Sequence, residues 1–351
     1  MKKKILSIAI FLIVMTAIIY IISPIFVPKW TKEEDNYITN IVRGFYAEEK
    51  NSLDVMFMGN SDMYRGMAPI LLWDEYGIAS YSYTSPGQRI WTGYYVLLDA
   101  LRKQKPDIIV FNVDAIQSTN QSNESNYRKA LDNMQMSSVK IRALLDRTFK
   151  MSKEKRISFV FPILRYHSRV ADLTVEDFTQ AYGYTEFAYK GMDLTAKIKA
   201  YEGGKTYMED KGETYKFPEK TKKYMDKIID VCKKENIELI LVEIPSADSW
   251  SYAKSKELSK YAEEKQLKFL DLNLVLDEIG LDWKTDTADG GDHLNVYGAE
   301  KVTKYMGKYL TENYDIEDRR KDEKYKSWFA ASEKYHKDKE EKIKQEQNKN
   351  Q

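Results

Sequence analysis

The chain has 351 residues, in which 55 Lys and Arg stand against 54 Asp and Glu, with three His and a single Cys. Because the net charge of +1 leaves no excess of basic residues for phosphate backbones, we expect no nucleic-acid partner. The single cysteine, Cys232, excludes an intrachain disulfide and a cysteine-based metal site. His and carboxylate residues show no ligand cluster along the sequence, so we expect neither a metal nor another cofactor.

The N-terminus has the composition of a membrane anchor. Three lysines follow Met1, and residues 5–22 form an uncharged, largely apolar run that is long enough to cross a bilayer. The positive-inside tendency then keeps the N-terminus in the cytoplasm and places the chain after about Val27 outside the cell membrane. A cleaved signal peptide is the alternative, but residues 23–28 lack a small-x-small cleavage pattern. We therefore predict that residues 1–28 form a cytoplasmic basic end and a single-pass anchor.

Strands and helices alternate after the anchor. Apolar runs bounded by Gly, Pro and polar residues predict strands at residues 54–58, 78–83, 108–113, 237–244 and 268–272. Helical periodicity and helix-ending residues predict helices at residues 70–76, 91–102, 219–234, 254–265 and 296–310. The alternation predicts an α/β fold with a mainly parallel sheet and right-handed crossovers. We assign these elements to one extracytoplasmic domain, residues 29–317.

Two segments depart from this alternation. Residues from about 120 to 214 are irregular and rich in Tyr, Lys, Ser and Met, with one predicted helix at residues 139–149. We expect this segment to be an insertion between the two halves of the sheet. Residues 318–351 consist mainly of Lys, Glu, Asp and Gln, which predicts a solvated helix or a disordered tail without chemistry.

Ser61 is the candidate nucleophile, because the first core strand ends in Gly59-Asn60-Ser61-Asp62 and sites in α/β folds are built where strands end. A serine needs a base that takes its proton, and the three histidines are His167, His293 and His336. We favour His293, which lies in a glycine-rich loop directly before the last predicted helix. In the alternative interpretation, both motifs are only helix caps.

Gly59-Asn60-Ser61-Asp62 resembles the first motif block of the SGNH or GDSL hydrolases, usually written Gly-Asp-Ser. Asp292-His293, before the last predicted helix, resembles their last block. The resemblance implies a three-layer α/β/α, flavodoxin-like fold in which Ser61 attacks an ester carbonyl and His293 activates it. With the N-terminal anchor, the chain looks most like the membrane-anchored SGNH-like proteins that act in acyl modification of cell-surface polymers. Examples are the lipoteichoic-acid D-alanyl transfer protein and the alginate O-acetylation proteins.

The chain departs from the family pattern at several positions. The last block usually reads Asp-x-x-His, but Asp289 lies four residues before the histidine and Asp292 lies directly before it. Either aspartate could orient His293, and we slightly prefer Asp292. The resemblance assigns the oxyanion-stabilising donors to Gly87 and Gln88 in the second block and to Asn112 in the degenerate third block, which reads Asn-Val-Asp.

A basic cluster in the predicted insertion is a candidate substrate site. Arg165 and Arg169 flank His167, and Arg side chains match the geometry of phosphate, so these residues are candidates for binding an anionic polymer. A purely structural role for the three residues is equally open.

The sequence therefore predicts a serine-dependent O-acyltransferase or carbohydrate esterase that acts on acyl groups of a cell-wall or exported polysaccharide, such as a teichoic acid. The resemblance also implies a multi-pass membrane acyltransferase as a partner. The alternative is a non-catalytic binding or assembly factor with the same fold. A metal-dependent phosphotransferase is disfavoured because the sequence shows no ligand cluster.

Overall fold

The computed structural model describes residues 2–29, 37–116 and 124–349. Its centre is a five-stranded sheet in the order β2-β1-β3-β4-β5, in which all neighbouring strands are parallel. The strands are β1 (Val55–Met58), β2 (Ser80–Ser82), β3 (Ile108–Asn112), β4 (Glu238–Glu243) and β5 (Lys268–Asp271). This is the flavodoxin-like order, and its direction reverses between β1 and β3, where sites of such sheets form.

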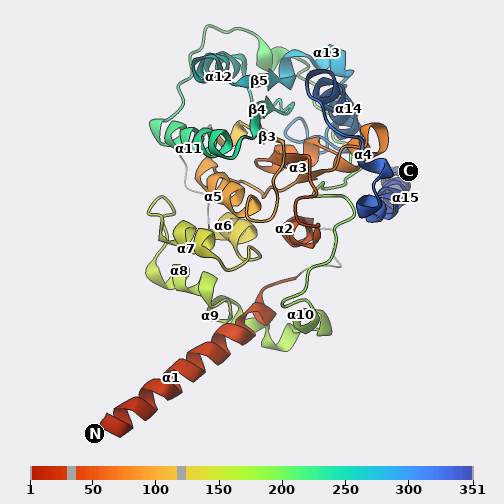
Figure 1. Cartoon of the computed structure of the whole chain (residues 1–351). Helices are drawn as coiled ribbons and strands as arrows, with labels where there is room; N and C mark the ends of the chain where they lie inside the picture. The colour runs from red at the N-terminus through yellow and green to blue at the C-terminus, as the bar shows by residue number, and fades with distance from the viewer. Residues whose placement is uncertain (1, 30–36, 117–123, 350–351) are drawn as a thin grey trace.

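Helices cover both faces of the sheet, so the predicted three-layer α/β/α architecture is confirmed. Successive side chains of a strand point to opposite faces. In β1, Met56 and Met58 therefore face one apolar core and Val55 and Phe57 face the other. The first core is closed by α2 (Tyr37–Ala47), α5 (Ile90–Ala100), α11 (Glu219–Glu235) and α12 (Tyr252–Lys265), and the second by α13 (Leu276–Ile279) and α14 (Val296–Asn313) (Figure 1).

The predicted strands and helices of the core are present, and their ends differ from the predicted ones by up to three residues. Two short helices follow β1 in the chain: α3 (Ser61–Gly66) and α4 (Pro69–Tyr76). The latter begins at Pro69, whose missing N–H would have had no partner in a first turn, and ends at Gly77 with a φ of +70°.

The N-terminal helix α1 (Lys2–Ile22) projects away from the domain (Figure 1). Its side chains are not buried in the protein, and its most apolar part has a mean hydropathy of 3.0. It is long and apolar enough to cross a membrane. The turn that follows, η1 (Ser23–Phe26), brings the chain to the domain.

The predicted insertion begins, where it is described, with five short helices, and residues 180–218 are irregular apart from the short turn η5 (Thr206–Met208), whereas its predicted first residues, 120–123, lie outside the described residues. Its helices are α6 (Glu124–Leu131), α7 (Ser138–Leu145), α8 (Lys153–Val160), α9 (Ile163–Tyr166) and α10 (Val175–Thr179). The predicted helix at residues 139–149 corresponds to α7. It ends early because Asp146 turns away to accept hydrogen bonds from the Tyr95 and Tyr224 hydroxyls. Helices α8 to α10 lie toward the end of the domain from which α1 projects (Figure 1).

The charged C-terminal segment, expected to be a solvated helix or a disordered tail, is a helix, but one face of it is not solvated. It forms α15 (Lys326–Lys349), which lies beside α4 (Figure 1). Trp328 and Tyr335 are buried, and the Trp328 ring lies 5.2 Å from that of Trp73 in α4. Trp328 and Tyr335 are seven positions apart, so they lie on one face of α15. The rest of this helix is mainly polar. This face docks on the domain, whereas most of the remaining helix stays in solvent.

Candidate active site

The turn between β1 and α3 positions Ser61. Gly59 has a φ of +142°, and a Cβ atom on it would lie 2.7 Å from the Cβ of Asn112 on β3, so only glycine fits there. Asn60 caps α3, since its side chain accepts a hydrogen bond from the backbone N–H of Asp62. Ser61 is the first residue of the helix and is partly exposed. Its hydroxyl is therefore not used as a helix cap.

The glycine-rich loop before α14 positions His293. The imidazole Nδ1 lies 2.7 Å from Asp289 Oδ2, and the backbone N–H of His293 donates to Asp289 Oδ1 at 2.7 Å. Asp292 Oδ2 is 3.2 Å from the same Nδ1. Gly290 and Gly291, with φ values of +89° and +101°, turn the loop back so that His293 reaches Asp289. The geometry favours Asp289 as the orienting carboxylate over Asp292, the residue that we slightly preferred from the sequence.

His293 meets the first turn of α3. Its Nε2 lies 3.7 Å from Oδ1 of Asp62, the residue that follows Ser61. Within the described part of the chain, the Ser61 hydroxyl makes no hydrogen bond, so the base faces the residue next to the nucleophile and is not paired with the nucleophile itself. Burial lowers the pKa of His293, but the bond to Asp289 and the charges of Asp62 and Asp292 outweigh this effect and raise it to about 9. The imidazole is therefore protonated at neutral pH.

Three carboxylates that the sequence analysis did not connect lie beneath this pair. The oxygens of Asp62, Asp114 and Glu243 lie within 4.8 Å of one another. Burial and the neighbouring negative charges raise the pKa of all three, and the pKa values of Asp62 and Glu243 lie well above the usual range. The Asn60 amide donates to Asp114, whereas the fully buried Glu243 carboxylate has no hydrogen-bond partner among the described residues. Such a set of oxygens either shares protons or holds a hard cation.

Position along the strands is the signal that could have revealed this cluster. Glu243 is the last residue of β4, Asp114 follows β3 by two residues, and Asp62 follows β1 by four. Because these three strands are neighbours in a parallel sheet, their carboxyl ends meet at one edge. Burial lowers the pKa of Lys254 on α12, and the nearby charges of Asp114 and Glu243 offset this lowering only in part.

The predicted oxyanion donors differ in how they are placed. Asn112 is buried at the end of β3 beside Gly59, its Oδ1 accepts from the Asp114 N–H, and its Nδ2 has no partner within the described residues. It is therefore a donor at the end of β3, next to the end of β1 that Ser61 follows. The side-chain amide of Gln88 instead donates to Ser85 Oγ at 3.0 Å. A Cβ atom on Gly87, which has a φ of +55°, would lie 2.3 Å from the Asn126 amide nitrogen, so this turn packs against α6.

The three predicted substrate-binding residues lie elsewhere. They belong to α9 and η4 (His167–Asp172), near the outer end of α1 and away from α3 (Figure 1). Arg169 donates to the carbonyl of Phe26 at 2.8 Å and pairs with Asp177, Arg165 lies 3.5 Å from a Glu124 oxygen, and His167 is exposed. The structure therefore does not bring Arg165, His167 and Arg169 together with Ser61 and His293, and it gives Arg169 a structural role.

No known protein-family model matches the chain, and no curated protein matches it. Solved structures resemble it at low identity. One, from Bacteroides fragilis and provisionally described as an acylhydrolase, is 12% identical, with 76% of this chain and 89% of that chain covered and a TM-score of 0.34. Another, a GDSL-like lipase from Bacteroides thetaiotaomicron, is 11% identical, with 80% and 100% covered and a TM-score of 0.38. Likenesses at this level do not assign an activity, so the functional argument rests on the site geometry.

Proposed function

We propose that the chain is a membrane-anchored, extracytoplasmic serine acyl-transfer enzyme of the SGNH type. Ser61 is the nucleophile, His293 the base and Asp289 the residue that orients the base. One observation carries this proposal: Asp289 fixes His293 by two hydrogen bonds, and the far nitrogen of the ring then meets the first turn of α3, where Ser61 lies. A base held in one tautomer beside a free serine is the arrangement that acyl transfer requires.

The proposed reaction has two halves. Ser61 Oγ attacks the acyl carbonyl, its proton passes to His293 Nε2, and the leaving alcohol takes that proton as the carbon–oxygen bond breaks. An acceptor hydroxyl then gives its proton to His293 as it attacks the Ser61 ester, and the Ser61 oxygen takes that proton back as its bond to the acyl carbon breaks. The unpaired Asn112 Nδ2 is the donor proposed for the oxyanion, a role worth about 3 kcal/mol in other enzymes. The Ser61 hydroxyl must turn toward Nε2 for the first step.

The setting follows from α1. Three lysines before an apolar helix favour a cytoplasmic N-terminus and an external domain, so we propose that the acyl groups belong to a cell-wall or exported polysaccharide or to a teichoic acid. Anchoring favours work beside a membrane partner such as a multi-pass acyltransferase. Water as the acceptor would make the enzyme an esterase, and a sugar hydroxyl would make it a transferase.

A fluorophosphonate probe tests the nucleophile directly. We expect an adduct on Ser61, located by mass spectrometry, in the wild-type protein but not in Ser61→Ala or His293→Ala. Ser168→Ala, at an exposed serine of η4, serves as the matched control and should label like the wild type. Labelling should be measured below and above about pH 9, where the imidazole loses its proton.

A non-catalytic binding factor is the second candidate. It is favoured by the unbonded Ser61 hydroxyl and by the Nε2 of His293, which faces Asp62 instead. The same experiment decides between the two: folded protein that stays unlabelled even above about pH 9, while a known serine esterase labels fully, supports the binding factor.

A further inference from the structure

Exposed apolar side chains are concentrated in one part of the domain. Outside α1, the described residues include twelve large hydrophobic side chains that are exposed, and nine of them belong to residues 141–184. Single exposed apolar residues are normal on a protein surface, but a gathering of them marks an interaction surface. The segment from residue 157 to residue 182 carries six of the nine.

We call residues 157–182 the collar. It contains the last residues of α8 and all of α9, η4 and α10. Its six exposed apolar side chains are between 49% and 78% exposed. They are Ile157, Leu164, Val170, Val175, Phe178 and Tyr182. Transfer of such groups out of water is favourable by roughly 25 cal/mol per Å² of apolar area, so the bare surface is unfavourable.

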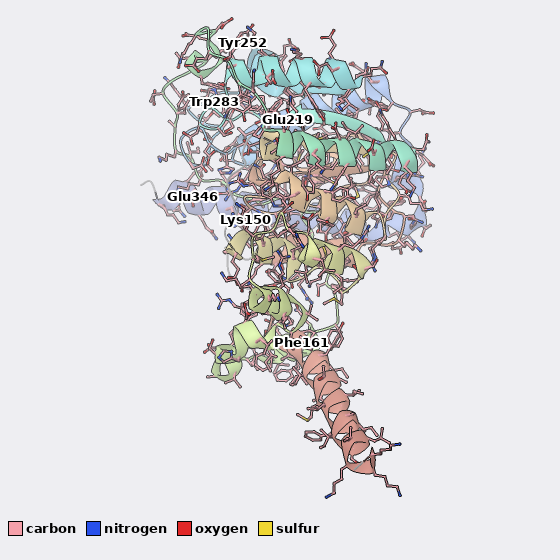
Figure 2. The ribbon with its side chains drawn as sticks, turned by 90° about the vertical axis from the view of Figure 1, so that its left-hand side faces the viewer. Lys150, Phe161, Glu219, Tyr252, Trp283 and Glu346 are labelled. Carbon is pink, nitrogen blue, oxygen red and sulfur yellow. The ribbon has the colours of Figure 1, made fainter. Side chains whose placement is uncertain are left out.

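The collar is fastened to the outer end of α1. The Tyr182 hydroxyl donates to the carbonyl of Ile21, and the ring of Phe161 lies edge-on to that of Tyr20 at 6.1 Å. Arg169 donates to the carbonyl of Phe26 at 2.8 Å. Figure 2 shows Phe161 where α1 joins the domain. The collar therefore lies at the level of residues 20–26 of the chain.

This level coincides with the expected edge of the bilayer. The apolar run of α1 extends from residue 5 to residue 22, and at 1.5 Å per residue it covers about 27 Å. The hydrocarbon core of a bilayer is about 30 Å thick. When α1 spans the membrane, its outer boundary therefore falls at Ile21 and Ile22, beside the collar. Tyr20 and Tyr182 are at the depth where tyrosine is enriched in membrane proteins.

We propose that the collar lies in the outer headgroup region of the membrane that α1 spans, with its apolar side chains at the boundary of the acyl chains. The occupant of this surface is lipid, because α9, η4 and α10, which carry four of the six exposed apolar side chains, pack against η1 directly after the apolar helix α1. Short helices with apolar faces bind membranes in this way, at a depth of about 5–10 Å. The inference rests on the proposed anchoring of α1 and is independent of the chemistry at Ser61.

Site-directed spin labelling of the full chain in nanodiscs tests the inference. The buried Cys232 is replaced by Ala, and single cysteines are introduced by Val175→Cys and Phe178→Cys in the collar. Leu274→Cys and Phe329→Cys are the matched controls, because these apolar residues are also exposed but lie outside the collar. Ile13→Cys, in the middle of α1, reports whether the anchor is embedded. Each label is probed with oxygen, which concentrates in lipid, and with a water-soluble nickel complex.

We expect the labels at positions 175 and 178 to be at least several-fold less accessible to the nickel complex than those at positions 274 and 329. The only other protein in the nanodiscs is the scaffold that encircles the lipid, so a surface made for a protein partner would leave the collar labels open to water. If the collar labels are open to nickel while the label at position 13 is protected, the proposed membrane contact of the collar is wrong and the anchoring by α1 still holds. If the label at position 13 is also open to nickel, both the anchoring by α1 and the membrane contact of the collar are wrong.

Discussion

The two ring nitrogens of His293 face carboxylates with different effects. Nδ1 is bonded to Asp289, which fixes the tautomer, whereas Nε2 faces the buried Asp62 at 3.7 Å. Asp289 itself has a lowered pKa, because its bonds to His293 outweigh its partial burial. Burial and the charge of Asp114 raise the pKa of Asp62 well above its usual range. Asp62 therefore influences how readily the proposed base gives up its proton.

The pH dependence of acylation follows from this arrangement. The pKa of His293 is raised from 6.5 to about 9, so below that pH the ring is charged and cannot accept the serine proton. We expect the rate of fluorophosphonate labelling to rise with pH and to level off above about 9. Asp62→Asn removes a carboxylate that stabilises the imidazolium, so this rise should move to lower pH. An identical pH profile in the variant would show that Asp62 does not carry the charge.

Asp289 and Asp292 should differ in their effect on labelling. Asp289→Asn removes the acceptor that holds the Nδ1 tautomer, and a comparable change in serine proteases lowers the rate on the order of 10⁴-fold. Asp292→Asn serves as the matched variant and should lower the rate about tenfold or less. Equal losses in the two variants, at unchanged melting temperatures, would contradict the assignment of Asp289.

The residues of the candidate site could be predicted from the sequence only in part. Ser61 and His293 were found because each lies in a short motif at the end of a core element. The choice between Asp289 and Asp292 depended on how two glycines curve a loop, which spacing alone does not give. Asp114 and Glu243 escaped notice because only the strand order brings them to Asp62 from distant parts of the sequence.

At the scale of the elements, β1 and β3 approach each other closely where both end at the candidate site. Gly59 lies against Asn112 of β3, and its φ of +142° is one that other residues rarely adopt. A side chain at this position would therefore push β1 from β3 and move Ser61. The approach of the two backbones is what places a donor on β3 beside a nucleophile that follows β1.

Gly59→Ala should therefore destabilise the fold by about 3 kcal/mol or more. Gly204→Ala is the matched control, because Gly204 also has a positive φ, of +57°, but nothing lies within 4 Å of its would-be Cβ atom. This control should lose only about 1–2 kcal/mol from backbone strain. Urea unfolding followed by circular dichroism measures both, and equal losses would show that the close approach to Asn112 is unimportant.

The docking of α15 gives a second prediction at this scale. Trp328 is buried beside Trp73, whereas its neighbour Phe329 is 51% exposed. We expect Trp328→Ala to lower the free energy of unfolding by about 3–5 kcal/mol, and Phe329→Ala by about 1 kcal/mol. Similar stabilities of the two variants would mean that the helix does not dock in solution.

Elements were predictable where their own sequence decides their structure. The strands β1, β3 and β4 contain uninterrupted apolar runs, as strands covered on both faces do, and polar residues stand only at the ends of β3 and β4. The collar helices and α6 were not predicted, because they are short and their apolar residues follow no single period. The charged composition of α15 hid the face formed by Trp328 and Tyr335, which only its packing against α4 reveals.

At the scale of the whole molecule, the proposed anchor α1 would determine on which side of the membrane the site lies. We expect the full chain, carrying an N-terminal tag, to lose its domain when protease is added to the outside of spheroplasts, while the tag remains protected. The reason is the lysine cluster before the apolar run, which disfavours translocation of that end. Detergent permeabilisation is the control and should expose the tag. A tag that is cut in intact spheroplasts would show that the N-terminus lies outside, which is the opposite of the predicted orientation.

The turn that follows α1 has its backbone carbonyls bonded by two basic side chains. Lys29 Nζ donates to the carbonyls of Pro24 and Val27 at 2.6 and 3.0 Å, and Arg169 holds that of Phe26. The turn after α1 is therefore fastened to the domain, and in the proposed membrane-anchored protein this would keep Ser61 at one height above the bilayer. An acyl group on a membrane-tethered polymer would then come within reach only at that distance along the chain. The distance between the membrane and Ser61 would therefore determine which units of the polymer are modified.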